Sequence, residues 1–223
     1  MTIKPKTIHP DIKYFGSFTQ AFRKHVHTLL YWGYNGALSR ITNDSHDETV
    51  LTGFICEGLK NKLRSFIVPD WCRYYAVFEN RPEEKDGIAG KKRSLPDIVI
   101  EGTMQGRPEF IFESKRLKGK DFGVAKYTGK DGMGCFIEGK YASRYDEAGM
   151  IGYVQGDSLP YWKSAIREKI NKDSTDLKFI SLQEKLGIID ELPDEWLSVH
   201  NRPDMNRPIS IYHILFDFRS EIV

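Results

Sequence analysis

The fold is decided by Ser94-Leu-Pro-Asp97-Ile-Val-Ile-Glu101 and, after a short turn, by Glu109-Phe-Ile-Phe-Glu113-Ser-Lys115. Both runs read as β-strands, in which successive side chains point to opposite faces. The seven residues between them, 102–108, carry turn-forming glycine and proline near their ends. If the two strands pair as a hairpin, Asp97 and Glu113 come together near one end, and Lys115 shares the face of Glu113.

Two neighbouring carboxylates indicate a metal site, because their mutual repulsion is relieved by a bound divalent cation. Asp97 and Glu113 are the predicted pair. Glu101 shares the Asp97 face but lies four residues along the strand, roughly 13 Å away by strand rise. We therefore expect Glu101 to miss the ion.

Composition predicts a single domain spanning residues 1–223, with 40% hydrophobic residues. Cys56, Cys72 and Cys135 have no Cys-x-x-Cys spacing, which favours neither a disulfide framework nor a zinc site. A reducing, cytoplasmic setting is expected. The first residues lack the apolar core of a signal peptide, and no run approaches 18 apolar residues, so no membrane association is predicted.

Basic residues gather around the predicted strands, although the net charge is only +2. Lys91, Lys92 and Arg93 precede the first strand. Residues 114–130 include one acidic residue, Asp121, and six basic residues, which are Lys115, Arg116, Lys118, Lys120, Lys126 and Lys130. This distribution suits a polyanionic substrate. A solvated charged surface is the alternative.

The remaining periodicity predicts an α/β domain without repeats or linkers. Helices are expected over residues 17–31, 47–65, 140–155 and 159–171. Strands are expected over residues 71–79, 97–101, 109–115, 176–182, 195–200 and 209–218. Residues 119–139 contain six glycines, which predicts a flexible connection able to fold over a substrate.

Histidines and arginines outside the two strands are predicted to be structural or solvent-exposed. His25 and His27 are two apart and do not share a helix face, so we expect partly exposed helix residues rather than a metal pair. The late-strand residues His200 and His213 are expected to have structural roles. Arg202 and Arg207 flank a proline-rich hairpin and are expected in a solvated turn, with contact to a phosphate backbone as the alternative.

The spacing of the charged residues resembles the motif of the PD-(D/E)XK nuclease superfamily. Pro96-Asp97 is followed, after fifteen residues, by Glu113-Ser114-Lys115, each at a strand end. The order of helix, three strands, helix and strand over residues 44–182 is also similar. This resemblance implies a restriction-endonuclease-like core (αβββαβ), a central mixed β-sheet flanked by helices, with an added N-terminal helix and C-terminal strand.

The same resemblance implies roles for individual residues. Asp97, Glu113 and the backbone carbonyl of Ser114 would bind Mg2+, for which Mn2+ can substitute. Lys115 would hold and deprotonate the attacking water or stabilise charge on the phosphate. A further catalytic and metal-binding glutamate on the preceding helix is expected to be Glu48, with Glu57 as second choice. Tyr141, Tyr145 and Gln155 are candidates from the following helix.

The function implied by the resemblance is Mg2+-dependent hydrolysis of DNA phosphodiester bonds, as in a restriction or phage-defence endonuclease. A homodimer or a partner protein would supply specificity. The alternatives are a catalytically quiet nucleic-acid-binding or assembly subunit with the same fold, and a metal-dependent phosphoesterase acting on nucleotides. The residues also have ordinary interpretations: Asp97 as a turn residue, Glu113 and Lys115 as a salt bridge on an exposed strand, and Glu48 as a helix-start residue.

Overall fold

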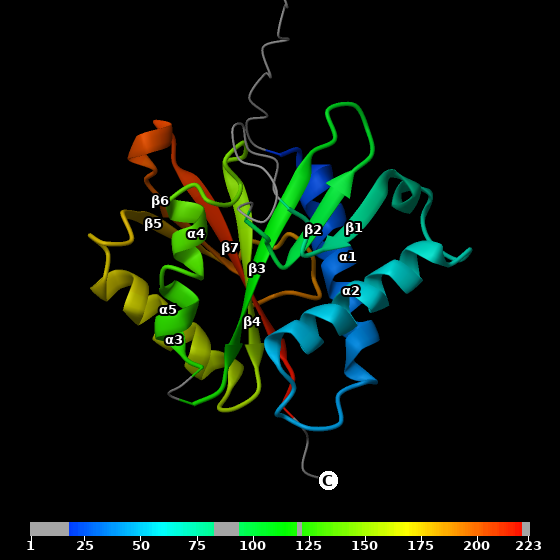
Figure 1. Cartoon of the computed structure of the whole chain (residues 1–223), viewed down its shortest axis with the longest axis horizontal. Helices are drawn as coiled ribbons and strands as arrows, with labels where there is room; N and C mark the ends of the chain where they lie inside the picture. The colour runs from blue at the N-terminus through cyan, green and yellow to red at the C-terminus, as the bar shows by residue number, and fades with distance from the viewer. Residues whose placement is uncertain (1–17, 83–93, 120–121, 220–223) are drawn as a thin grey trace, which may run out of the picture.

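A seven-stranded mixed β-sheet flanked by helices organises the computed structural model, which describes residues 18–82, 94–119 and 122–219 (Figure 1). The strand order is β1-β2-β3-β4-β7-β6-β5. The strands are β1 Tyr75–Glu79, β2 Ile98–Gly102, β3 Glu109–Leu117, β4 Glu147–Val154, β5 Phe179–Glu184, β6 Trp196–His200 and β7 Ile209–Asp217. The helices are α1 Gln20–Leu38, α2 Glu48–Arg64, α3 Val124–Thr128, α4 Met133–Ile137 and α5 Leu159–Lys172, with 3-10 turns at Asp70–Tyr74 and Pro203–Met205. The predicted α/β class, with one mixed sheet between helices, is confirmed.

The central hairpin pairs as the sequence predicted. β2 and β3 are antiparallel, with Ile98 opposite Phe112, so that Asp97 falls beside Glu113. β3 then runs parallel to β4, and β4 runs parallel to β7. The hairpin is therefore the join between an antiparallel edge and a parallel centre.

Helices cover both faces of the sheet, as Figure 1 shows. His27 of α1 packs against Phe110 and Tyr212, whereas Tyr127 of α3 packs against His213. Tyr212 and His213 are consecutive on β7 and so point to opposite faces. α2 packs beside α1, and α5 packs beside α3. The two helical layers thus bury the sheet from both sides.

The helix predicted over residues 140–155 is wrong, because residues 147–154 form strand β4. Apolar residues in this segment are spaced as on a helix, but every residue of β4 is buried. A central parallel strand is covered on both faces and therefore lacks the alternation that identifies an exposed strand. Gly149 and Gly152 lie where a Cβ atom would collide with Phe112 and Leu117 of β3, which fixes the close approach of the two strands.

The flexible connection predicted over residues 119–139 is also corrected. Residues 120 and 121 lie outside the described part, but the rest contains α3 and α4. Tyr127, Met133 and Phe136 are fully buried there. Gly132 packs so closely on the backbone that a Cβ would collide with the Tyr127 carbonyl oxygen. The glycines of this segment permit close packing of the backbone. The prediction of flexibility was based on the glycine content alone.

Most other boundaries agree with the predictions within a few residues. α1 starts after Thr19, whose hydroxyl accepts a hydrogen bond from Phe22 N at 3.1 Å, and it runs seven residues beyond the predicted end. α2 and α5 lie where expected. The strand predicted from Trp71 begins with a 3-10 turn and becomes extended only at Tyr75.

The late-strand histidines have structural roles, as expected. His213 Nδ1 hydrogen-bonds the Tyr127 hydroxyl at 3.0 Å, and its Nε2 lies 2.7 Å from Ser198 Oγ. The Ser198 hydroxyl also lies 2.7 Å from His200 Nε2. His27, expected to be partly exposed, is instead fully buried with its Nε2 2.8 Å from Glu195 Oε1. The α1 face that carries His27 turns toward the sheet.

Arg202 does not lie in a solvated turn. Its side chain is 1% exposed, and its guanidinium donates to the carbonyl oxygens of Ala142 at 3.1 Å and Tyr145 at 2.7 Å. Arg207 is partly buried and donates to Ser143 O. Both arginines therefore stabilise residues 142–145, the segment that precedes β4.

Replacing Arg202 with alanine should lower the free energy of unfolding by about 2–4 kcal/mol, because the Tyr145 carbonyl loses the guanidinium donor and the Ala142 carbonyl keeps only its bond from Tyr145 N. Urea denaturation followed by circular dichroism measures this loss. Arg144→Ala, which removes an exposed arginine of the same segment, is the matched control and should stay within about 0.5 kcal/mol of the wild type. Equal stability of both variants would contradict the stabilising role.

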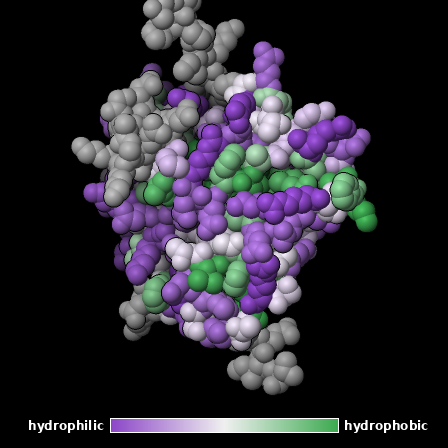
Figure 2. Space-filling view, turned by 45° about the vertical axis from the view of Figure 1, so that its right-hand side comes forward, coloured by the Kyte–Doolittle hydropathy of each residue, from purple (hydrophilic) through white to green (hydrophobic). Residues whose placement is uncertain are grey.

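The surface on the side of α1 and α2 is mostly hydrophilic, with separate hydrophobic areas among the charged side chains (Figure 2). Phe66 and Ile67, which follow α2, are exposed hydrophobic residues. Among the described helices, none has the length and apolar character needed to cross a membrane.

Candidate active site

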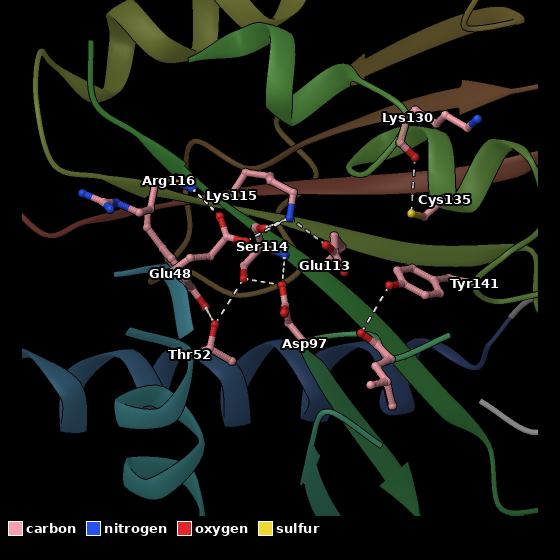
Figure 3. A network of polar contacts seen from close by, with 12 residues as sticks. Glu48, Thr52, Asp97, Glu113, Ser114, Lys115, Arg116, Lys130, Cys135 and Tyr141 are labelled. Carbon is pink, nitrogen blue, oxygen red and sulfur yellow. Dashed lines mark hydrogen bonds and ion pairs between the residues drawn. The ribbon is translucent and has the colours of Figure 1, made fainter. Parts of the chain in front are cut away.

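The predicted site residues come from three elements that meet at one end of the central hairpin. Asp97 directly precedes β2, Glu113 and Lys115 lie on β3, and Glu48 is the first residue of α2. Figure 3 shows Lys115 reaching between Glu48 and Glu113, with Asp97 on the side of Ser114. The structure therefore brings the four predicted charged residues into one cluster.

Three oxygen atoms surround the Lys115 ammonium. Lys115 Nζ donates to Glu113 Oε1 at 2.7 Å, to the Ser114 carbonyl at 2.7 Å and to Glu48 Oε1 at 3.0 Å. Each of these oxygens was expected to bind the metal ion. The site thus gathers two carboxylates and one backbone carbonyl around a single point of positive charge.

Asp97 is fixed by its neighbour on β3. Its Oδ2 accepts hydrogen bonds from Ser114 N at 2.7 Å and from Ser114 Oγ at 2.5 Å. Ser114 Oγ also hydrogen-bonds Thr52 Oγ1 at 3.2 Å, and Thr52 Oγ1 lies 2.9 Å from the Tyr153 hydroxyl. This chain of hydroxyl groups ties Asp97 to α2 and β4, and the sequence analysis did not identify Thr52 or Tyr153.

Burial changes the ionisation of the cluster. It raises the pKa of Glu113 to about 8, helped by the negative charge of Asp97 and opposed by the Lys115 ammonium. Burial also raises the pKa of Asp97, although its bonds to Ser114 act the other way. Burial alone would lower the pKa of Lys115, but Glu113 and Glu48 outweigh it and raise that pKa. The ammonium therefore stays charged, and Glu113 gains a proton easily.

The donor set fits a hard divalent cation. Glu113 Oε2 is buried and has no hydrogen-bond partner among the described residues, although such a buried acceptor normally has one. Carboxylate and carbonyl oxygens are the ligands that Mg2+ prefers. Within the described ranges no three Asp, Glu, His or Cys side chains form a metal cluster by themselves, so a backbone carbonyl or water would complete the coordination.

Glu57 and Glu101 lie outside the cluster. Glu57 is exposed on α2 and pairs with Arg40, with Arg40 Nη2 2.7 Å from Glu57 Oε1. Glu101 is buried and pairs with Arg81 and Arg107. Of the two glutamates proposed on the preceding helix, only Glu48 reaches Lys115, and Glu101 is engaged elsewhere, as expected.

If Glu48 acts in the site, Glu48→Gln should lower activity on a phosphodiester by about tenfold or more, whereas Glu57→Gln should leave it unchanged. The reason is that Glu48 Oε1 accepts from the Lys115 ammonium and Oε2 accepts from Arg116 N at 3.1 Å. Initial rates of hydrolysis of a labelled oligonucleotide measure the difference. Equal rates for the two variants would leave Glu48 as a helix-start residue only.

The three candidates from the following segment have other partners. Tyr145 is buried and accepts a hydrogen bond from Glu109 N at 3.2 Å, so it is a packing residue. The Tyr141 hydroxyl donates to Leu95 O at 3.2 Å, just before the Pro96-Asp97 pair. Gln155 accepts from Arg116 Nε at 2.8 Å. Gln155 and Tyr141 thus support the backbone and side chains around the site.

A cleft of about 610 Å³ opens beside the cluster between the start of α2 and the α3 region. Its charged lining consists of four bases, Lys115, Arg116, Lys126 and Lys130, and three acids, Asp47, Glu48 and Asp131. The excess of bases over acids in residues 114–130 pointed to this region, but it did not distinguish Arg116 from its neighbours. Four of the basic residues predicted to gather around the strands, Lys91, Lys92, Arg93 and Lys120, lie outside the described residues, as does Asp121.

Comparisons of the chain with protein-family models, with curated proteins and with solved structures found no match to any of them.

Proposed function

We propose that the chain is a metal-dependent nuclease that hydrolyses DNA phosphodiester bonds, with a restriction-endonuclease-like core. The observation that carries the proposal is the convergence of Glu113, Glu48 and the Ser114 carbonyl on Lys115, beside Asp97 and at the edge of a basic cleft. The order α2-β1-β2-β3-α3-α4-β4, with two short helices between β3 and β4, is compatible with the same core.

The chemistry follows from the charge of the substrate. Hydrolysis of a phosphodiester concentrates negative charge on the phosphoryl oxygens. Glu113, Asp97 and the Ser114 carbonyl would hold Mg2+, which when bound stabilises that charge and lowers the pKa of water. Lys115 contributes a point charge. Its three donors are engaged by Glu113, Glu48 and the Ser114 carbonyl, and they would turn to the attacking water or the phosphate when those oxygens bind the ion.

Burial argues against the interpretation of Glu113 and Lys115 as an exposed salt bridge. Glu113 is only 6% exposed, and its second carboxylate oxygen lacks a partner among the described residues. Burying a carboxylate costs stability unless it is fully paired. A catalytically quiet binding subunit gains nothing from that cost, and we therefore favour the enzyme.

Incubation of purified protein with supercoiled plasmid, labelled oligonucleotides and mononucleotides tests the proposal. Cleavage of the polymers should require Mg2+ or Mn2+, stop with EDTA and disappear in Asp97→Ala. Equal cleavage by wild type and variant would remove the nuclease assignment. Hydrolysis of mononucleotides alone would favour the phosphoesterase, and binding of DNA without cleavage would favour the quiet subunit.

A further inference from the structure

The cleft contains a second group of cations that the proposed hydrolysis does not use. Arg116 follows Lys115 on β3, and Lys126 lies on α3. The Arg116 guanidinium lies 4.3 Å and the Lys126 ammonium 4.6 Å from the centre of the Phe122 ring. One aromatic ring therefore holds two positive charges at the wall of the same cleft.

We propose that Arg116 and Lys126, packed on Phe122, form a phosphate clamp that binds the DNA backbone next to the phosphate being cleaved. The inference rests on the proposed function and adds how the strand is held. Glu48 connects the two sites, because Oε1 accepts from Lys115 Nζ and Oε2 from Arg116 N. A strand bound to the clamp is thereby placed beside the carboxylates.

Arg116 is held in position before a ligand binds. Its Nε donates to Gln155 Oε1 at 2.8 Å, and its Nη1 donates to Asp47 Oδ1 at 3.0 Å. No described residue hydrogen-bonds Nη2. The Asp47 side chain is 78% exposed, so that ion pair is weak and a phosphate can replace it. A planar guanidinium fixed in this way suits a phosphate oxygen.

The charge of the cleft indicates a polyanion rather than a single phosphate. Neither Lys126 nor Lys130 forms an ion pair with an acidic residue of the described part of the chain. Together with Arg116 and Lys115 they make four cations along a cleft whose lining also includes the acids Asp47, Glu48 and Asp131. A nucleic-acid strand carries a regularly repeated negative charge, which matches several separate cations.

Phe122 is a positioning residue in this scheme. Its ring is partly exposed but faces two cations rather than the hydrophobic core. Replacing it with leucine retains both charges and removes the surface that orients them. We therefore expect Phe122→Leu to weaken binding while leaving the number of phosphate contacts unchanged.

Fluorescence anisotropy of labelled duplex and single-stranded DNA, with wild-type protein in EDTA at 50–200 mM salt, tests the clamp. Arg116→Gln and Lys126→Ala should each weaken binding by about tenfold at low salt. Each should also lower the slope of log K against log salt by about 0.9 for duplex or about 0.7 for a single strand. Phe122→Leu should lower affinity without changing the slope. Lys24→Ala, which removes an exposed lysine on α1, should match the wild type.

Arg116 is largely buried, so Arg116→Lys and thermal unfolding accompany Arg116→Gln. Loss of affinity in a folded Arg116→Lys variant, with the slope preserved, supports the planar contact. Wild-type slopes in Arg116→Gln and Lys126→Ala would overturn the clamp even if the wild type cleaves DNA. Conversely, reduced slopes without any cleavage by the wild type would retain the clamp and remove the hydrolysis. Absence of DNA binding by the wild type would overturn the clamp.

Discussion

Replacing Lys115 with methionine should lower kcat/KM for DNA cleavage by about 10²–10⁴-fold, the range in which positioned acid–base groups act. Methionine has a similar length but neither charge nor donors, so the attacking water and the phosphate lose the ammonium that Glu113, Glu48 and the Ser114 carbonyl hold in place. Steady-state rates on a labelled duplex in Mg2+ measure the effect.

Lys24→Ala is again the matched control and should cleave as the wild type does. Binding of Mn2+ by the Lys115→Met variant separates the roles of the site, because the surrounding oxygens remain. We expect the ion to bind and the rate to stay low. A Lys115→Met variant that folds and cleaves at the wild-type rate would be incompatible with any catalytic role for the ammonium.

Affinity for Mn2+ should rise by about tenfold per pH unit well below pH 8, and by about 50-fold between pH 6 and pH 8. The cause is Glu113, whose pKa is raised to about 8 by burial and by Asp97. A carboxylate must lose its proton before it can bind a metal ion. The proton on Glu113 therefore competes with the ion until the pH exceeds its pKa.

Isothermal titration calorimetry in buffers with different ionisation enthalpies counts the protons released on binding. About one proton per ion is expected near pH 6.5 and almost none at pH 9. Without metal, the protonated Glu113 stabilises the fold fully below its unfolded pKa of 4.5, and this contribution is lost as the pH rises through about 8. Mn2+ affinity that is constant from pH 6 to pH 8 would show that Glu113 is not a ligand.

The hairpin was predictable because its information is local. Alternation along β2 and β3, with a short turn between them, sets the register that places Asp97 beside Glu113. The resemblance added the role of Lys115 and the choice of Glu48 over Glu57. That choice depends on where α2 begins relative to β3, and local periodicity says nothing about the relative placement of two elements so far apart in sequence.

Other parts of the fold were not predictable, because they depend on contacts between residues far apart in the sequence. Every residue of β4 is buried, its first residue Glu147 included, and only its position between β3 and β7 distinguishes a central strand from a helix. Arg202 looks like a surface residue in a proline-rich turn until the carbonyl groups of Ala142 and Tyr145 converge on it. Arg116 and Phe122 also meet only after the chain has folded.

The two glycines of β4 have a consequence for how the cluster of charges is assembled. Gly149 leaves room for the Phe112 ring, and Gly152 leaves room for Leu117, on either side of the segment of β3 that bears Glu113 and Lys115. Any larger residue would collide with the Phe112 ring at position 149, or with Leu117 and Leu215 at position 152, and would force these side chains or the strands that carry them to shift. The spacing on which the proposed hydrolysis depends is therefore set in part by missing side chains, on a strand that contributes none of the proposed reactive groups.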